Sequence, residues 1–472
     1  MYEGSSYVTI YCRRYHKNER KRKRKRRMLA SMLAMLLTFL AVFTIHRIPM
    51  GEVQASPEAN IVLTPEEAAR AAVYENKTAK EIIEKITKAG EKTAPVIFVD
   101  AGHGGADAGC SRGGVEEKTI NLAIAKALKT RLEAMGYMVI MSRESDDYIS
   151  KEDRVKLANT ACADIYISIH QNATDEGDEI KGMEVWYDGT DATRDNKRLA
   201  QLIKQQTSIS TQAQEREIRG NADFHVTGST KMPACLIETG FLTNTEERGK
   251  LASKEYQEKI AEGIAKGIDY YFHPKTMYLT FDDGPSEENT IRVLEILKDR
   301  DIKATFFLVG ENVKQYPEIA RRIVADGHVI GIHSDTHDYK AIYADKESFM
   351  QDLEAAHQII YEVTGVDTKL VRFPGGSVNA YNEKVSEEIA EELTKQGYTY
   401  FDWNASLGDA TGNAVPEQLV TNGVETTLGR KKVVMLAHDV VYSTGICLND
   451  LLDNLPEYEM KAIDEDVEPI QF

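Results

Sequence analysis

Short β-rich runs alternate with helical periodicity along most of this chain, and few folds accommodate such a pattern. One series begins at VIFVD (96–100) and a second begins at MYLTFDDG (277–284). The alternation predicts α/β sheet domains, and the six strand–helix repeats of the second series favour a barrel. Because 472 residues are enough for two cores, we expect one α/β domain over 95–272 and another over 277–455.

An uncharged apolar stretch near the N-terminus predicts a membrane segment. Residues 28–45 (MLASMLAMLLTFLAVFTI) would span about 27 Å as a helix at ~1.5 Å per residue, close to the hydrocarbon thickness. Residues 1–27 have a formal charge of +9 and are expected to stay on the cytoplasmic side. Since the whole chain has a formal net charge of −17, the remaining residues carry −26. This acidic part is expected outside the cytoplasm. A buried soluble helix is the alternative, and the basic flank argues against it.

The sequence leaves open whether this segment is removed. Val53 and Ala55 place small residues at a plausible signal-peptidase position before Ser56, but the apolar core is long for a signal peptide. The protein is therefore expected either to be anchored in the membrane through residues 28–45 or to be secreted after cleavage near Ala55. Both outcomes place the two domains in the extracytoplasmic cell envelope.

The regions that flank the two domains are polar. Residues 46–94 contain an amphipathic helical pattern that begins at Thr64-Pro65 and ends at Gly90, which is typical of a stalk or linker. Residues 456–472 are acidic and form either a loose tail or a last packed edge. The acidic exported part offers no basic stripe for a phosphate backbone, so nucleic acid is not an expected partner. No protein partner is predicted.

Four polar side chains follow strands or precede helices in the first series. VIFVD runs into the glycine-rich AGHGGADAG, which presents His103, and DIYISIH ends at His170. Together with Glu117, before the helical TINLAIAKAL, these imidazoles could bind zinc and leave one position open for water. Glu238, in LIETGFLTN, could then act as the base. A single strand-end histidine is more often only a satisfied polar residue, but four convergent groups favour a site.

These blocks resemble, in order, the zinc N-acetylmuramoyl-L-alanine amidases. DAGHGGADAG, EKTINLA, SIHQN and MPACLIETGFLTN are similar to that family over roughly residues 96–272. The resemblance implies a three-layer α/β sheet domain with the following residues: zinc ligands His103, Glu117 and His170, and catalytic Glu238. Glu116 competes with Glu117 as the ligand, and we prefer Glu117 because the family's glutamate directly precedes a lysine, here Lys118.

The second series places two adjacent carboxylates, Asp282 and Asp283, at the end of the strand in TFDDGP. Neighbours in an extended chain point opposite ways, so one carboxylate can bind metal while the other stays free. HSDTH places His333 and His337 four residues apart, which on a helical turn would be one face and would suit two imidazoles on one cation. We therefore expect Asp283, His333 and His337 as metal ligands and Asp282 as the base.

Two further strand-end residues complete this second set. His438 in MLAHD is the candidate acid that protonates the departing amine. Arg372 in RFPGG is expected to hold Asp282 ionised and oriented.

The blocks of the second series, over about 277–439, resemble the NodB-type polysaccharide deacetylases, whose fold is a distorted (β/α) barrel. The resemblance implies that the backbone N–H of Gly375 contributes to the oxyanion hole. It also implies that Asp409 tunes His438, with Asp402 as the second candidate.

The chain departs from this family in two places. Family members often carry an aromatic residue where Gly375 stands, and a tryptophan where Ala410 follows the tuning aspartate. The groove wall is therefore either more open or filled by another residue such as Trp403, and this leaves the preferred sugar undecided.

Together the two resemblances predict a bifunctional peptidoglycan hydrolase. The amidase would cleave the bond between muramic acid and the first alanine of the stem peptide, using zinc. The deacetylase would remove an N-acetyl group from the glycan, using zinc or another divalent metal, and the two products could close into a muramic lactam. The alternatives are a deacetylase directed at N-acetylglucosamine or another acetylated polysaccharide, and a glycan-binding wall protein without turnover.

Overall fold

The computed structural model describes residues 94–220, 224–412 and 415–472. The segments expected over residues 1–27 and 28–45, and nearly all of the stalk expected over 46–94, lie outside these described residues. Among the helices that are described, none has the length and the apolar character needed to span a membrane. The described part consists of two sheet domains, residues 94–272 and 275–472, which are treated separately below.

The first domain is built on a six-stranded sheet in which all neighbours are parallel except β6 and β8. The strand order is β4-β1-β5-β8-β6-β7, so that β7 forms an edge. The central strands are almost fully buried, which fits their continuous runs of β-branched and apolar residues. The strands are β1 (Val96–Ala101), β4 (Met138–Met141), β5 (Ile165–Asn172), β6 (Met183–Tyr187), β7 (Glu215–Gly220) and β8 (Ala234–Phe241).

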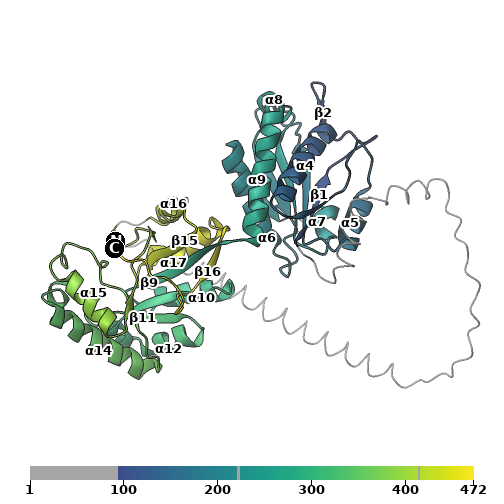
Figure 1. Ribbon diagram of the computed structural model, residues 1–472. Coiled ribbons are helices and arrows are strands. Elements are labelled where there is room, and N and C mark those ends of the chain that lie inside the picture. The colour runs from purple at the N-terminus through teal and green to yellow at the C-terminus, as the bar shows by residue number, and fades with distance from the viewer. Residues whose placement is uncertain (1–93, 221–223, 413–414) are drawn as a thin grey trace, which may run out of the picture. The chain divides into compact units, whose positions relative to one another are not determined.

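Helices cover both faces of this sheet, which makes the first domain a three-layer α/β fold (Figure 1). Buried side chains of α4 (Glu117–Ala134), α6 (Asn196–Thr211) and α9 (Lys254–Phe272) form one core with the sheet. On the other face, α5 (Lys151–Thr160) and the short α7 (His225–Gly228) pack on Phe98 and Tyr166. The remaining elements are a small hairpin and a connecting helix: β2 (Ser111–Arg112), β3 (Val115–Glu116) and α8 (Thr245–Leu251).

The second domain is built on a curved sheet whose strand pairs are all parallel. The order is β13-β12-β11-β10-β9-β15-β14, and β16 pairs with the first half of β9. The end strands β13 and β14 do not pair within the described residues, so the barrel is open, as the expected distortion implies. The strands are β9 (Lys275–Asp282), β10 (Thr305–Val309), β11 (Val329–Ser334), β12 (Leu370–Val371), β13 (Thr399–Tyr400), β14 (Ala405–Ser406), β15 (Lys432–His438) and β16 (Tyr458–Lys461).

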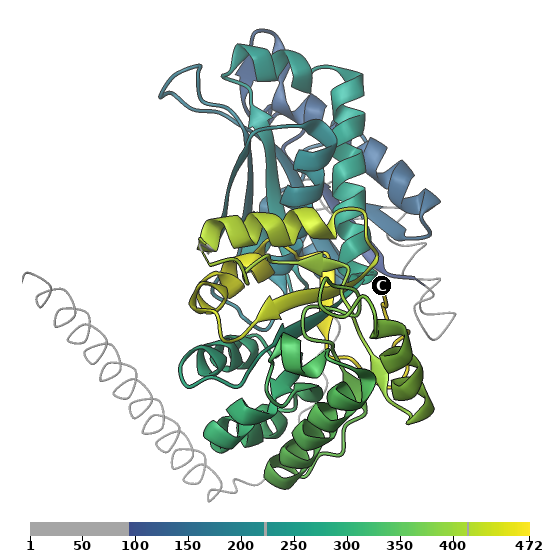
Figure 2. The same ribbon diagram turned by 90° about the vertical axis from the view of Figure 1, so that its left-hand side faces the viewer.

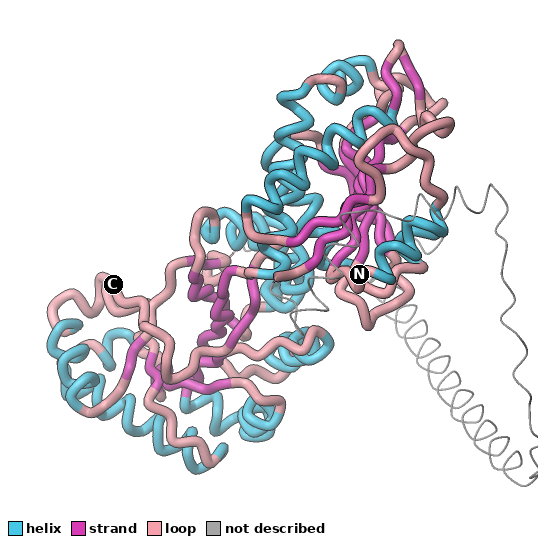
Figure 3. The backbone as a smooth tube through the Cα atoms, turned by 45° about the vertical axis from the view of Figure 1, so that its right-hand side comes forward, coloured by secondary structure: helices cyan, strands magenta, loops and turns pink. Residues whose placement is uncertain are grey.

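Helices of the second domain lie around the outside of its strands (Figures 2 and 3). Their apolar faces join the inner strands in one large core that includes Phe281 and Phe306. The helices are α10 (Asn289–Asp299), α11 (Gly310–Gln315), α12 (Pro317–Ala325), α13 (Tyr339–Ile342), α14 (Lys346–Thr364), α15 (Ser386–Lys395), α16 (Pro416–Thr427) and α17 (Tyr442–Asp453).

The acidic C-terminal residues form a packed edge of the second domain. After β16, Ile463 and Val467 are buried beside Phe307 and Phe401. The backbone of Asp402 donates a hydrogen bond to the carbonyl of Ile470. Of the two alternatives for residues 456–472, the structure shows the packed one.

Candidate active sites

The three proposed ligands of the first domain converge at the carboxyl end of its sheet. His103 follows β1, Glu117 is the first residue of α4, and His170 lies near the end of β5. Glu117 Oε1 lies 3.2 Å from His103 Nε2 and 3.0 Å from His170 Nδ1. Tetrahedral bonds of ~2.0–2.2 Å to zinc separate ligand atoms by roughly 3.4 Å, so these distances fit one cation. Glu116 instead lies beside Lys118, at 3.7 Å.

Neighbouring groups fix the orientation of these ligands. Asp107 Oδ2 lies 2.8 Å from His103 Nδ1, which leaves Nε2 to face Glu117. Glu117 accepts hydrogen bonds from the backbone N–H groups of Cys110 and Gln171. Burial alone would raise the pKa of Glu117, but the two imidazoles outweigh it and hold the pKa well below its usual range. The carboxylate is therefore charged, as a metal ligand must be.

Two glycines make room for the ligands. A Cβ atom on Gly102 would lie 2.3 Å from the His170 ring, and one on Gly109 would lie 2.5 Å from Glu117 Oε2. His103 itself adopts a left-handed backbone with φ of 61°, which is uncommon for a residue other than glycine. The glycine-rich loop after β1 therefore permits a close approach that side chains would block.

Glu238 lies on β8, directly opposite His170 of β5 and Glu184 of β6 in the sheet. Its Oε2 is buried and has no hydrogen-bond partner among the described residues. Burial raises the pKa of Glu238 well above its usual range, and the charges of Glu117 and Glu184 add to the effect. A carboxyl group in such surroundings keeps its proton to a higher pH than an exposed glutamate does.

The second ligand set follows β9 and β11 of the barrel. Asp283 Oδ1 lies 3.3 Å from His333 Nε2 and 3.2 Å from His337 Nε2, again close to the ligand separation in a tetrahedral site. Burial alone would raise the pKa of Asp283, but the two imidazoles outweigh it and lower the pKa. The expected helical turn is wrong: His333 is the second-last residue of β11, and His337 stands in a loop with φ of 57°. The loop, not an i,i+4 helix face, brings the two rings together.

Asp282 and Arg372 form a buried pair beside this ligand set. Arg372 is completely buried, and its NH1 donates to Asp282 Oδ1 at 2.9 Å and to Thr280 Oγ1 at 2.6 Å. Its Nε donates to the carbonyl of Phe401 and its NH2 to the carbonyl of Asp402. The guanidinium is therefore held in one position beside the Asp282 carboxylate.

His438 of β15 stands opposite Asp282 of β9 in the sheet. Its Nδ1 lies 2.8 Å from Asp409 Oδ1, and its backbone N–H donates to Asp409 Oδ2. Burial would lower the pKa of His438, but Asp409 outweighs it and raises the pKa to about 9. The other candidate, Asp402, instead accepts hydrogen bonds from Ser377. The structure brings Asp409, and not Asp402, to His438.

Aromatic rings fill the space beside the glycines of the RFPGG loop. Gly375 has φ of 75°, and a Cβ atom there would lie 2.8 Å from the ring of Tyr339. A Cβ atom on Gly376 would lie 3.0 Å from the ring of Trp403. The groove wall therefore contains Tyr339, which the sequence did not single out, in addition to Trp403. Tyr339 lies two residues after the end of the HSDTH block, and this proximity in sequence was the available signal.

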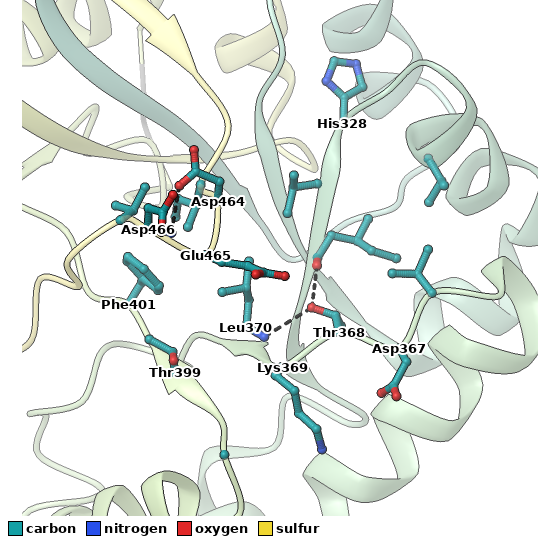
Figure 4. Close-up of a pocket in the computed structure, with 17 residues that line it drawn as sticks. His328, Asp367, Thr368, Lys369, Leu370, Thr399, Phe401, Asp464, Glu465 and Asp466 are labelled. Atoms are coloured by element: carbon teal, nitrogen blue, oxygen red, sulfur yellow. Dashed lines mark hydrogen bonds between the residues drawn. The ribbon is translucent and has the colours of Figure 1, made fainter.

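A cavity of about 890 Å³ lies at the opposite end of the barrel strands (Figure 4). It is lined by the first residues of β11, β12 and β13 and by residues 463–467. None of the candidate catalytic residues lines it. The chemistry is therefore expected at the carboxyl ends of the strands, where the two carboxylates and the histidines gather.

Comparison with known proteins separates the chain into the same two parts. The N-acetylmuramoyl-L-alanine amidase family matches residues 97–270, and the polysaccharide deacetylase family matches residues 269–401. N-acetylmuramoyl-L-alanine amidase LytC of Bacillus subtilis (strain 168) is 39% identical over 176 residues, which are 37% of this chain and 35% of LytC. The chain thus spans about a third of the length of that relative.

Two other relatives are matched over most of their length. The germination-specific N-acetylmuramoyl-L-alanine amidase of Bacillus subtilis (strain 168) is 34% identical over 194 residues, 38% of this chain and 81% of the relative. The peptidoglycan-N-acetylglucosamine deacetylase of Bacillus cereus is 33% identical over 205 residues, 42% of this chain and 73% of the relative. The chain belongs to both families. Both are families of hydrolytic enzymes, and the first and second domains are called the amidase and the deacetylase domain below.

Proposed function

We propose that this protein is a bifunctional hydrolase of peptidoglycan, which removes the stem peptide from muramic acid and an acetyl group from the glycan. The observation that carries the proposal is the repetition of one arrangement in both domains. A carboxylate lies between two imidazole nitrogens at 3.0–3.3 Å, and a separate catalytic carboxyl group lies close by. Three protein ligands with an open position are typical of catalytic zinc sites.

In the amidase domain, His103, Glu117 and His170 would hold a zinc ion, which would polarise the scissile carbonyl and activate water. Glu238 takes the proton of the attacking water and passes it to the nitrogen of the leaving alanine. The C–N bond breaks as the new C–O bond forms, which yields a lactyl carboxylate and a free amine. The raised pKa of Glu238 suits a group that must first accept and then donate a proton.

In the deacetylase domain, Asp283, His333 and His337 would hold zinc or another divalent metal, which would polarise the acetyl carbonyl in the same way. Asp282 accepts the proton of water while Arg372 keeps its carboxylate in place. The water oxygen forms a C–O bond to the acetyl carbon, the C–N bond breaks, and His438 donates a proton to the departing amine, which yields acetate and a free amine. The backbone N–H of Gly375 donates to no acceptor among the described residues, and it would serve as an oxyanion donor to the acetyl oxygen.

The cellular setting belongs to the same proposal. Residues 28–45 either anchor the protein or are cleaved near Ala55, so both domains act outside the cytoplasm. We further propose that the predicted ranges 95–272 and 277–455 are the two functional units, and that the second unit also includes the start of β9 at Lys275 and residues 456–472. The amidase exposes the lactyl carboxylate and the deacetylase exposes the amine of the same sugar. The two groups can then close into a muramic lactam.

The test is a digest of purified peptidoglycan by the zinc-loaded protein, read by mass spectrometry. Glu238→Gln is expected to lose free stem peptides and keep deacetylated sugar, and Asp282→Asn is expected to do the reverse. The digest also shows which sugar has lost its acetyl group. Deacetylation of N-acetylglucosamine alone would favour the alternative that the deacetylase is directed at that sugar and not at muramic acid. Neither product from the unaltered protein would contradict the proposal and favour a glycan-binding role, and products without any lactam would remove only the last step.

A further inference from the structure

The edge of the amidase sheet carries two arginines that the zinc chemistry does not use. Both lie on β7, which pairs with β6 and has no strand on its other side among the described residues. Arg216 is about one-third exposed (32%) and Arg219 is more exposed (44%). Arg216 lies over the ring of Phe241, and Arg219 lies over the ring of Trp186. Each guanidinium is thus supported by an aromatic face and still open to solvent.

A buried carboxylate, Glu184, lies between these arginines and the proposed catalytic residue Glu238. Glu184 of β6 lies directly opposite Glu238 of β8, and residues so paired in antiparallel strands present their side chains on one face. The side chain of Glu184 is only 4% exposed, and it accepts hydrogen bonds from Asn172 at 3.0 Å and from Arg216 at 2.5 Å. Arg219 approaches the same carboxylate at 3.6 Å.

Among the described residues, Glu184 is the carboxylate that both guanidinium groups approach, so one carboxylate lies beside two positive charges. A structural ion pair would need only one arginine. An excess guanidinium on an aromatic support is suited to bind a carboxylate with two parallel hydrogen bonds.

The spacing fits a stem peptide. Two strand spacings of ~4.8 Å place the backbone of β7 roughly 10 Å from β8, and the arginine side chains reach back from there towards Glu184. A peptide advances by at most ~3.6 Å per residue, so a carboxylate on the residue after alanine lies within about 7 Å of the scissile bond.

We propose that Arg216 and Arg219 bind the α-carboxylate of the acidic residue that follows the first alanine, and so select stems with a free carboxylate over amidated stems. Glu184 is a positioning residue, which holds Arg216 against the sheet. This inference rests on the proposed amidase function, and it specifies which stem peptides the amidase prefers.

The experiment uses the full, zinc-loaded chain and two muropeptides, muramyl-L-alanyl-D-glutamate and the same compound with the α-carboxylate amidated. The unaltered protein is expected to show a KM about tenfold lower for the free acid, because a hydrogen bond to a charged group is worth about one factor of ten or more. Arg219→Gln is expected to remove this preference by raising KM for the acid alone, with kcat unchanged. Arg131→Gln, in the last turn of α4 and similarly exposed (36%), is the matched control and is expected to keep the preference.

A binding measurement separates this inference from the amidase proposal. Titration of the product dipeptide L-alanyl-D-glutamate is expected to give tighter binding than its amide, and Arg219→Gln is expected to abolish the difference whether or not the protein turns over. Equal binding of acid and amide by the unaltered protein, or an equal loss for both ligands in Arg219→Gln, would overturn the inference. Absence of cleavage together with the expected binding difference would instead refute only the amidase activity.

Discussion

Glu238 and Asp282 are the proposed bases of the two domains, but their surroundings are opposite in charge. Glu238 is buried near Glu117 and Glu184, and its pKa is raised. Asp282 is buried against Arg372, whose guanidinium donates to it at 2.9 Å. In the proposed mechanisms, one carboxyl group therefore serves as both base and acid in the amidase, whereas the deacetylase uses His438 as a separate acid.

The pairing of His438 with Asp409 leads to a prediction about pH. His438 must carry a proton to act as an acid, and Asp409 raises its pKa to about 9. The deacetylase rate is therefore expected to fall as the pH rises through about 9, or somewhat lower once a bound cation repels the imidazolium. The fall in rate at high pH forms the alkaline limb of the pH profile. Asp409→Asn is expected to shift this limb to a pH that is lower by ~1–3 units. The pH profile of kcat measures it.

Asp402→Asn is the control for this prediction. Asp402 is equally buried but accepts hydrogen bonds from Ser377, so its loss is expected to leave the alkaline limb where it is. An alkaline limb that stays in place in Asp409→Asn would show that His438 is not the acid.

At the scale of elements, the glycine-rich loop between β1 and α4 decides whether the amidase site can form. Gly102→Ala would place a Cβ atom 2.3 Å from the His170 ring, so the ring must move. Zinc affinity of the amidase site is expected to fall by ~10–100-fold, the range seen when the support of a ligand is lost. Competition with a chelator, followed by the rate of stem-peptide release, measures the change.

Gly249→Ala, elsewhere in the same domain, is the matched control for this substitution. Gly249 lies inside α8 and has no atom within 4 Å of an added Cβ. The substitution is expected to leave zinc affinity unchanged and to stabilise the helix by up to ~1 kcal/mol. An unchanged zinc affinity in Gly102→Ala would mean that His170 is not a ligand in the position described.

The central elements of both domains could be predicted from the sequence because their strands are continuous apolar runs. The predicted strand at 96–100 is observed as β1, and the helical stretch TINLAIAKAL lies within α4. Helix α6 was missed because its sequence, NKRLAQLIKQQTSIST, shows few apolar positions, although Leu199 and Ile203 are fully buried. The edge strand β7 was missed because its sequence, EREIRG, has four charged residues and only one apolar side chain, Ile218.

In the candidate sites too, some residues could be predicted from the sequence and others could not. Residues at strand ends, such as His103 and His438, carry a sequence signal because a polar group there interrupts an apolar run. Glu184 and Tyr339 lacked a partner in sequence, since their neighbours come from other strands and loops. Only the register of β6 against β8 reveals that Glu184 faces Glu238.

At the scale of the whole molecule, the two domains have separate hydrophobic cores that share no residue. Leu128 is fully buried in the core of the amidase domain. Leu128→Ala is expected to cost about 2–5 kcal/mol of stability in that domain. Calorimetry is expected to show a lower unfolding temperature for the amidase domain. Deacetylase activity is expected to persist above that temperature.

Two further substitutions test the independence of the cores. Leu297→Ala, in the deacetylase core, is expected to lower the other transition. Leu428→Ala, at a residue that is 69% exposed, is expected to lower neither by more than ~0.5 kcal/mol. A single transition that moves with either core substitution would contradict separate unfolding.

The buried Oδ1 of Asp283 accepts no hydrogen bond within the described residues, although it lies between two imidazoles. An unsatisfied buried oxygen destabilises the folded state by about 1–3 kcal/mol, and a cation that it binds removes this cost. A cation at 100 times its dissociation constant adds about 2.7 kcal/mol to the folded state. The heat resistance of this protein would thus report the metal content of its surroundings, and a preparation stored with a chelator would age faster than the same protein stored with zinc.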